Sequence, residues 1–264
     1  MSGMSDKEDE KKSTKKDEAE IVEENGLVYV DYVGRTKEDG EIFDLTLEDV
    51  AKEEGIYNDE ESYKPMLVAI GKNWLLPALE EELVGMEVGE SKTVEVPPED
   101  AAGPRDPDKI KLVSKRQLQK QGVSPRKGAR VEVGRQKGII TNVLGRRVRV
   151  DFNSPLAGKT LVFDVTVKGI VSGEIDKINA VIKRRIPGLP EDKYDARIEG
   201  GTVFIELPKE SRYIENVQYA EIGIARDTLK VIEEAEEVKI VITYERPEEL
   251  KEEKETQEDE ENEE

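Results

Sequence analysis

The chain has 264 residues and a formal net charge of −20 at pH 7, and it contains neither cysteine nor histidine. This composition excludes disulfides, cysteine-ligated zinc, thiol nucleophiles and every mechanism that needs an imidazole. Any catalysis must come from Asp, Glu, Tyr, Lys or Ser, or from the shape of a cavity. A metal site made of carboxylates alone stays open by composition, but no aspartate cluster has the spacing of a calcium loop, so we expect no metal and no cofactor.

The two ends of the chain differ from the middle. Residues 1–25 are charged and nearly devoid of apolar side chains, which predicts a flexible charged arm. From Pro247 onward, eleven acidic residues stand against two lysines, which predicts a disordered acidic tail over 247–264. No signal-peptide pattern and no apolar run of about 18 residues occurs, so we expect a cytoplasmic protein without membrane contact.

Residues 26–100 contain alternating strands and one helix. The first strand runs into Asp39-Gly40, a hairpin signal because glycine adopts the positive φ that tight turns need. A longer polar loop and a short strand, "MLVAI", follow. Leucines at helical spacing then predict a helix over "WLLPALEEELVGM", beginning after Gly71, and "GESKTVEVPPE" predicts another strand.

Residues 104–150 form a basic block with fourteen Lys or Arg against three Asp or Glu, a local charge of +11, so that the rest of the chain sums to −31. Alternating Val and Ile with glycine-punctuated turns predict a small β-rich domain over 104–153, with a short helix in "VSKRQLQKQG". The strand "KTLVFDVTVKGIV" follows it. The reversed charge indicates a separate module.

The order of elements in residues 171–246 is predicted to be αββαβ. "EIDKINAVIKRRIPG" and "YIENVQYAEIGIARDTLKVI" indicate helices, and "YDARIEGGTVFIELP" indicates a hairpin that turns at Gly200-Gly201. "EEVKIVITYE" indicates a last strand. This is a complete small α/β layer that we expect could fold alone.

Taken in order, the Asp-Gly hairpin, "FD", "IGKNWLLPALEEELVGMEVGE", "VEVPPEDAAG" and "LVFDVTV" resemble the FKBP family of peptidyl-prolyl cis/trans isomerases. The resemblance covers residues 26–168 and is strongest to the SlyD-like and archaeal long forms, in which an insert-in-flap chaperone domain precedes the last FKBP strand. It implies an α+β fold, an antiparallel sheet wrapped on one helix. The implied domains are 26–103 plus 154–170 for the isomerase, 104–153 for the inserted chaperone and 171–246 for the C-terminal α/β domain.

The resemblance also implies a proline-binding pocket between sheet and helix. Leu75 and Leu76 match the segment whose backbone N–H binds the substrate carbonyl, and Leu79 matches the pocket floor. Two positions depart from the common family pattern: Leu79 replaces a floor Trp, and Ala102 replaces a flap Tyr, so we expect weak macrolide binding. The remaining implied pocket residues are Tyr32, Phe43, Asp44, Met66 and Phe163.

Such a pocket fits a chain without His or Cys. An X-Pro amide resists rotation with a barrier of roughly 18–20 kcal/mol, because conjugation flattens it. A dry apolar cavity disfavours the polar planar amide more than the twisted one, and donors that hold the rotated carbonyl add selectivity for the transition state. Taken singly, however, Phe43, Met66 and Phe163 also suit an ordinary core, and Asp44 a turn cap.

The implied partners are unfolded or nascent polypeptides that contain proline. Two alternatives stay open: a holdase without catalysis, and a ribosome- or RNA-associated protein that uses the basic block. The block lacks any aromatic before Phe152 on which bases could stack, which favours the chaperone. For the C-terminal domain two roles stay open: formation of a homodimer, or extension of the client-binding surface. Candidate client contacts in the insert are Ile110, Leu112, Val113, Leu118, Val123, Ile139, Ile140, Val143 and Leu144.

Overall fold

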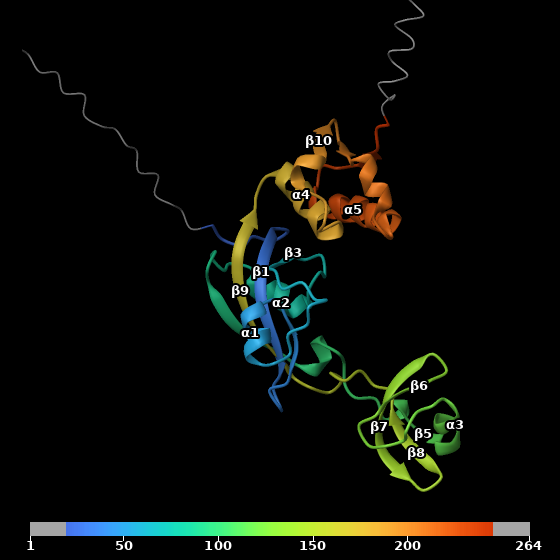
Figure 1. The fold of residues 1–264 in the computed structure, drawn as a ribbon. Coiled ribbons are helices and arrows are strands. Elements are labelled where there is room, and N and C mark those ends of the chain that lie inside the picture. Colours follow the sequence, from blue (N-terminus) through green and yellow to red (C-terminus); the bar gives the residue numbers. More distant parts are fainter. Residues whose placement is uncertain (1–19, 245–264) are drawn as a thin grey trace, which may run out of the picture.

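The computed structural model describes residues 20–244, which form three sheets and five α-helices (Figure 1). The predicted acidic tail lies outside the described residues, as does most of the predicted N-terminal arm. Val22 is nevertheless buried, its N–H donates to the Met86 carbonyl at 2.9 Å, and Ile21 bridges Glu87. The predicted flexible arm therefore extends too far, because Val22 belongs to the core under the first sheet.

The first sheet is antiparallel and has the order β2-β1-β9-β4, with β3 also on β1. β1 and β9 pair along their whole length, from Leu27 opposite Val171 to Thr36 opposite Leu161. The other edge of β1 is divided between β3 and β2. The bounds are β1 Leu27–Thr36, β2 Ile42–Leu45, β3 Met66–Ala69, β4 Ser91–Val96 and β9 Leu161–Val171.

The helix of this unit, α2, spans Pro77–Leu83 and is shorter than predicted. It begins at Pro77 and not after Gly71, because proline suits the first helical position while it excludes the residue before it from helical geometry. Leu76 accordingly has an extended backbone. A second helix, α1 (Glu48–Glu53), lies where the sequence analysis expected only a polar loop. That prediction was wrong because α1 buries only Ala51 and so has no apolar periodicity.

The basic block forms its own antiparallel sheet, β5-β8-β7-β6, with the predicted short helix α3 (Lys115–Lys120) beside it. Figure 1 shows this sheet set apart from the first one and joined to it by two chain segments. Its hydrophobic cluster contains only residues of the block: Val113, Leu118, Val131, Ile140, Val148 and Val150. The strand bounds are β5 Ile110–Ser114, β6 Arg130–Val133, β7 Gln136–Leu144 and β8 Arg147–Asp151.

The C-terminal unit has the predicted αββαβ order. Its sheet is β10-β11-β12, with β10 antiparallel and β12 parallel to β11, and the two helices pack on each other. The bounds are α4 Glu174–Arg185, β10 Asp195–Glu199, β11 Thr202–Glu206, α5 Val217–Val231 and β12 Glu237–Val241. Short 3₁₀ turns lie at Pro98–Asp100, Pro107–Lys109, Glu191–Lys193 and Lys209–Tyr213.

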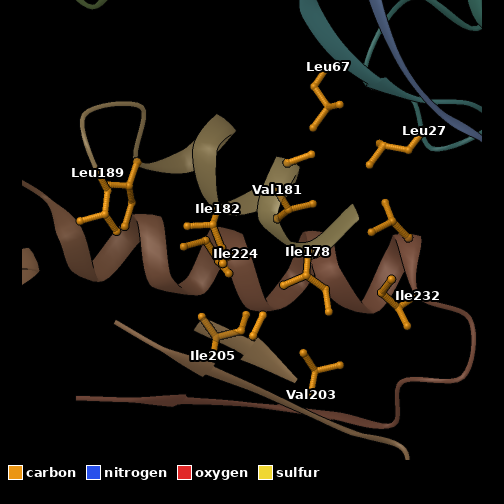
Figure 2. Close-up of a cluster of buried hydrophobic side chains, with 14 of the residues drawn as sticks. Leu27, Leu67, Ile178, Val181, Ile182, Leu189, Val203, Ile205, Ile224 and Ile232 are labelled. Atoms are coloured by element: carbon orange, nitrogen blue, oxygen red, sulfur yellow. The ribbon is translucent and has the colours of Figure 1, made fainter. Parts of the chain in front are cut away.

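The core of the C-terminal unit is shared with the first sheet. Leu27 of β1 and Leu67 of β3 belong to the same cluster as Ile178 and Val181 of α4 (Figure 2). Burial of these side chains against each other stabilises the contact between the two units, by about 25 cal/mol for each Å² of apolar surface removed from water. The expectation that 171–246 could fold alone therefore overlooks the apolar surface it buries on β1 and β3.

Among residues 20–244, no helix combines the length and apolar character needed to cross a bilayer.

Candidate functional site

A cavity of about 250 Å³ lies between the first sheet and the segment leading into α2. All of the predicted pocket residues except Met66 line it. They come from β1, β2, β9, the loop before α2 and α2 itself, so only the folded sheet brings them together. The lining residues are Tyr32, Phe43, Asp44, Leu75, Leu76, Leu79, Ala101, Ala102, Leu156, Leu161 and Phe163.

Three aromatic rings form one wall of this cavity. Phe43 and Phe163 meet edge to face, with ring centroids 5.5 Å apart, and the centroids of Tyr32 and Phe163 are 6.2 Å apart. Edge-to-face contacts of this kind favour a fixed geometry. The wall is therefore a rigid apolar surface.

Gly34 on β1 makes this wall feasible, and the sequence analysis did not single it out. Gly34 pairs with Phe163 of β9, and a Cβ at this position would lie 2.8 Å from the ring of Phe43 and 3.0 Å from that of Phe163. Those distances are too short for carbon–carbon contact. The signal available in sequence was a glycine inside a strand, which often marks close approach by a neighbouring group.

Tyr32 and Asp44 form the polar edge of the cavity. The Tyr32 hydroxyl donates to the Asp44 carboxylate at 2.8 Å, and the Tyr32 backbone N–H donates to the Thr46 hydroxyl at 2.9 Å. Burial, followed by the hydrogen bond and charge of Asp44, raises the pKa of the Tyr32 phenol above its ordinary value. The phenol therefore stays protonated, and its orientation is set by an exposed carboxylate.

Glu80 organises the opposite side, and the sequence analysis also missed it. Its carboxylate is buried and accepts hydrogen bonds from the backbone N–H groups of Asn73 (3.2 Å), Trp74 (2.6 Å) and Leu75 (2.8 Å). The Leu75 N–H is thereby occupied. Among residues 20–244 no acceptor is found for the Leu76 N–H, so of the two predicted donors Leu76 is the one left for a ligand.

The segments that flank the basic insert close the cavity. Ala101 and Ala102 precede the insert, and Leu156 follows it. The two segments are bound to each other, because the Gly158 N–H donates to the Gly103 carbonyl at 2.9 Å. Next to them, at the base of the insert, Arg105 forms an ion pair with Asp151. Of these lining residues only Ala102 was identified from the sequence.

Met66 and Trp74 lie next to this cavity but do not line it. Met66 faces a larger neighbouring cavity, whose lining also includes Tyr32 and Asp44. Trp74, the single tryptophan, packs against the clusters of both the first sheet and the C-terminal unit. The Arg184 guanidinium lies over its ring, 4.1 Å from the centroid.

The candidate client contacts of the insert divide into two groups. Val113, Leu118 and Ile140 are buried in the insert's own core, and Val123 and Val143 pack partly against it. The other four alternate away from the core along their strands, and among them Leu112 and Leu144 are 51% and 44% exposed. These four are Ile110, Leu112, Ile139 and Leu144.

Arginines share that outer face. Arg149 is the cross-strand neighbour of Leu112, and Arg147 is the neighbour of Leu144. We call the outer face of the insert the surface formed by Ile110, Leu112, Ile139, Leu144, Arg147 and Arg149. Phe152, the nearest aromatic, packs against the insert core and not on this face.

Within the described chain, no three acidic side chains are grouped so that they could hold a metal ion.

Comparison with known proteins gives the family context. Residues 18–168 match the family model of FKBP-type peptidyl-prolyl cis-trans isomerase, and residues 174–245 match a model described as FKBP26_C-terminal. The chain is 35% identical over 154 residues to a short-type peptidyl-prolyl cis-trans isomerase of Methanocaldococcus jannaschii, covering 58% of this chain and 97% of the relative.

Two bacterial relatives show the same pattern. An FKBP-type 16 kDa peptidyl-prolyl cis-trans isomerase of Escherichia coli is 35% identical over 130 residues, 47% of this chain and 85% of the relative. An FKBP-type peptidyl-prolyl cis-trans isomerase SlyD of Treponema pallidum is 33% identical over 118 residues, 43% of this chain and 66% of the relative.

Proposed function

This chain belongs to the FKBP-type peptidyl-prolyl cis-trans isomerase family, and we propose that it isomerises X-Pro bonds of unfolded or nascent polypeptides in the 250 Å³ cavity. One observation carries the assignment of the site. Side chains from three strands and from the segment around the start of α2 converge on a single, mainly apolar cavity.

The geometry suggests how the bond rotates. The proline ring enters between the Phe43–Phe163 wall and Leu79, where water is excluded and the charge-separated planar amide is disfavoured. The Leu76 N–H donates to the substrate carbonyl that rotates out of the amide plane. Tyr32, held by Asp44, presents a protonated phenol at the edge. No proton transfer and no covalent intermediate is needed.

Relaxation of the cis/trans equilibrium in an X-Pro tetrapeptide tests this assignment. The wild-type chain should accelerate it, and Phe163→Ala and Asp44→Leu should each lower kcat/KM by about tenfold or more, since each tenfold corresponds to about 1.4 kcal/mol of transition-state binding. Ile56→Ser, an exposed change away from the cavity, is the control. Unchanged rates in both site variants would refute the site.

We further propose that the domains divide as the sequence predicts and that residues 104–153 are a client-holding chaperone domain. The outer face of the insert supports this, because exposed apolar side chains alternate there with arginines, a pattern suited to apolar segments that carry acidic residues. The absence of an aromatic from that face weighs against RNA binding by base stacking.

Suppression of aggregation of a denatured client tests the outer face. Leu112→Ser with Leu144→Ser should reduce protection, whereas Ile56→Ser with Val88→Ser, similarly exposed outside the insert, should not. Full protection by the first variant would place client holding elsewhere. Protection together with no isomerisation by the wild type would favour the holdase.

The C-terminal unit suits a homodimer as a second role. Tyr219 and Ile222 on α5 are 68% and 65% exposed, and Leu229 extends the same helix face. Sedimentation of the full chain should show a dimer that Tyr219→Glu with Ile222→Glu dissociates. A monomer in the wild type would reject this role. Ribosome proximity and a cytoplasmic location stay predictions, which co-sedimentation with ribosomes and cell fractionation would test.

A further inference from the structure

The larger cavity beside the candidate site, about 720 Å³, opens between the first sheet and α4. Tyr32 and Asp44 line both cavities, and their 2.8 Å hydrogen bond places this pair at the boundary. The far wall comes from the C-terminal unit, through Ala180, Lys183, Arg184 and Pro187. A polypeptide with its proline in the smaller cavity would therefore pass the Tyr32–Asp44 pair and enter the larger one.

The inner part of the larger cavity is apolar. Its apolar lining residues are Tyr29 of β1, Pro65, Met66 and Leu67 of β3, and Ala180 of α4. Leu67 and Ala180 are buried in the cluster that joins the two units, so this surface is held by the core and not by a mobile loop. Its chemistry suits one apolar client side chain.

The rest of the lining carries the charged groups. Lys64, Lys168, Lys183 and Arg184 line the cavity together with Asp44, and Asp31, Glu191 and Asp227 supply carboxylates to all of these cations except Lys64. Outside the basic block the chain sums to −31, so a cavity lined by four cations and one carboxylate differs from the acidic average of that part of the sequence.

Ion pairing leaves much of this charge available. Lys183 bonds Glu191 at 2.7 Å and Lys168 lies 3.8 Å from Asp31, yet about half of each lysine side chain is exposed. Lys64 has no ion-pair partner within residues 20–244. Arg184 is committed to Asp227, at 3.2 Å, and to the Trp74 ring. Lys64, which has no partner in this part of the chain, and Lys168, whose nearest carboxylate is 3.8 Å away, are thus the lysines most able to pair with a client carboxylate.

We propose that the larger cavity is a second client subsite, which binds the residues next to the proline and selects an apolar residue adjacent to acidic ones. This inference rests on the proposed isomerase function. It assigns Met66 to the flanking residues and not to the proline, and it makes α4 part of the substrate groove.

The test compares kcat/KM for three peptides with the full chain at low ionic strength. One is an X-Pro tetrapeptide; the others are eleven-residue peptides with leucine and two charged residues on each side of the proline, glutamates in one and lysines in the other. Wild type should favour the acidic peptide by about three- to tenfold, although the net charge of the protein opposes this.

Lys64→Glu with Lys168→Glu should abolish or reverse the preference. Lys209→Glu with Lys230→Glu, which changes net charge equally on exposed positions away from the cavity, should keep it. The acidic-to-basic ratio is measured on the same protein sample, so a partly unfolded variant cannot mimic the result.

Turnover of the tetrapeptide without an acidic preference in wild type would overturn the subsite and leave the isomerase standing. No turnover of any peptide would overturn both.

Discussion

At the scale of single residues, the site depends on a few positions whose side chains, or lack of them, shape the cavity. The Phe43 and Phe163 rings approach each other because Gly34 has no Cβ to separate them. The protonated phenol of Tyr32 is held by one carboxylate. The resemblance to the FKBP family indicates the aromatic positions in the sequence, whereas the need for Gly34 arises from neighbouring strands.

Gly34→Ala should damage the site without removing any functional group. The added methyl group would lie 2.8 Å from the Phe43 ring, so the rings must move into the cavity. We expect a loss of about 1–3 kcal/mol in the free energy of unfolding, as for other overpacked sites, and a lower kcat/KM for the tetrapeptide. Gly40→Ala is the control. Gly40 lies at a turn where an added Cβ would have no neighbouring atom within 4 Å, so this variant shows the effect of backbone strain without crowding. Full activity of Gly34→Ala would contradict the packed aromatic wall.

The raised pKa of Tyr32 makes a prediction about alkaline pH. A folded-state pKa above the unfolded value of 10.0 contributes stability that is present below that value and lost as the pH rises beyond it. Since the chain has no histidine and the folded Tyr32 stays protonated beyond the ordinary pKa of a phenol, we expect activity to be flat from about pH 6 to 10. Unfolding free energies of wild type and Tyr32→Phe, measured from pH 7 to 11, should converge at high pH. A constant difference would contradict the assignment.

At the scale of elements, the short helix α2 acts through the loop that precedes it. Glu80 gathers three backbone N–H groups of that loop and leaves the Leu76 N–H toward the cavity. The insert likewise contributes to the cavity only through its two connecting segments, in which Ala101, Ala102 and Leu156 line the cavity.

Glu80→Ala should therefore disturb catalysis from a position that does not line the 250 Å³ cavity. It leaves three N–H groups without their charged acceptor, which we expect to cost about 2–4 kcal/mol of stability. Glu80→Gln keeps one acceptor oxygen and should recover part of both stability and kcat/KM. Chemical denaturation and the tetrapeptide assay measure the two effects. Equal behaviour of Ala and Gln variants would show that the carboxylate oxygens do not position this loop.

At the scale of the whole molecule, the first sheet carries a unit at each end. The insert leaves it between β4 and β9, and the C-terminal unit follows β9 directly and packs on β1 and β3 (Figure 1). A chain of contacts joins that unit to the site: Asp227 of α5 binds Arg184 of α4, Arg184 covers Trp74, and Trp74 precedes the loop residues that line the cavity.

Asp227→Ala should loosen this connection. Asp227 is buried and also bonds the Arg185 Nε at 2.7 Å, so its loss leaves two guanidinium groups without a counterion, at a cost of about 2–3 kcal/mol. Because Trp74 is the single tryptophan, its fluorescence reports the change directly. We expect a shifted emission and earlier unfolding in Asp227→Ala, and no shift in the exposed variant Asp192→Ala. Unchanged emission would mean that Arg184 holds its place without Asp227.

Much of the fold could be predicted because many of its elements follow from patterns of neighbouring residues. Strand alternation, the Asp-Gly and Gly-Gly turns and the charge reversal of the insert each depend on neighbouring residues alone. The helix α1 was not predicted because it buries only one residue and so has no apolar periodicity. The start of α2 was predicted too early because helical spacing was given more weight than Pro77. The αββαβ order of the C-terminal unit was confirmed, and its shared core was not foreseen.

The sequence by itself determined the types of chemistry available and the family pattern, and the resemblance to that family pointed to Tyr32, Phe43 and Phe163 as pocket residues. Only the tertiary structure decided that Met66 belongs to a neighbouring cavity, that Glu80 occupies the Leu75 N–H, and that Leu27 and Leu67 join the C-terminal core. These facts depend on contacts between segments far apart in the chain. Such contacts are selected by packing and by hydrogen-bond satisfaction, which no local pattern records.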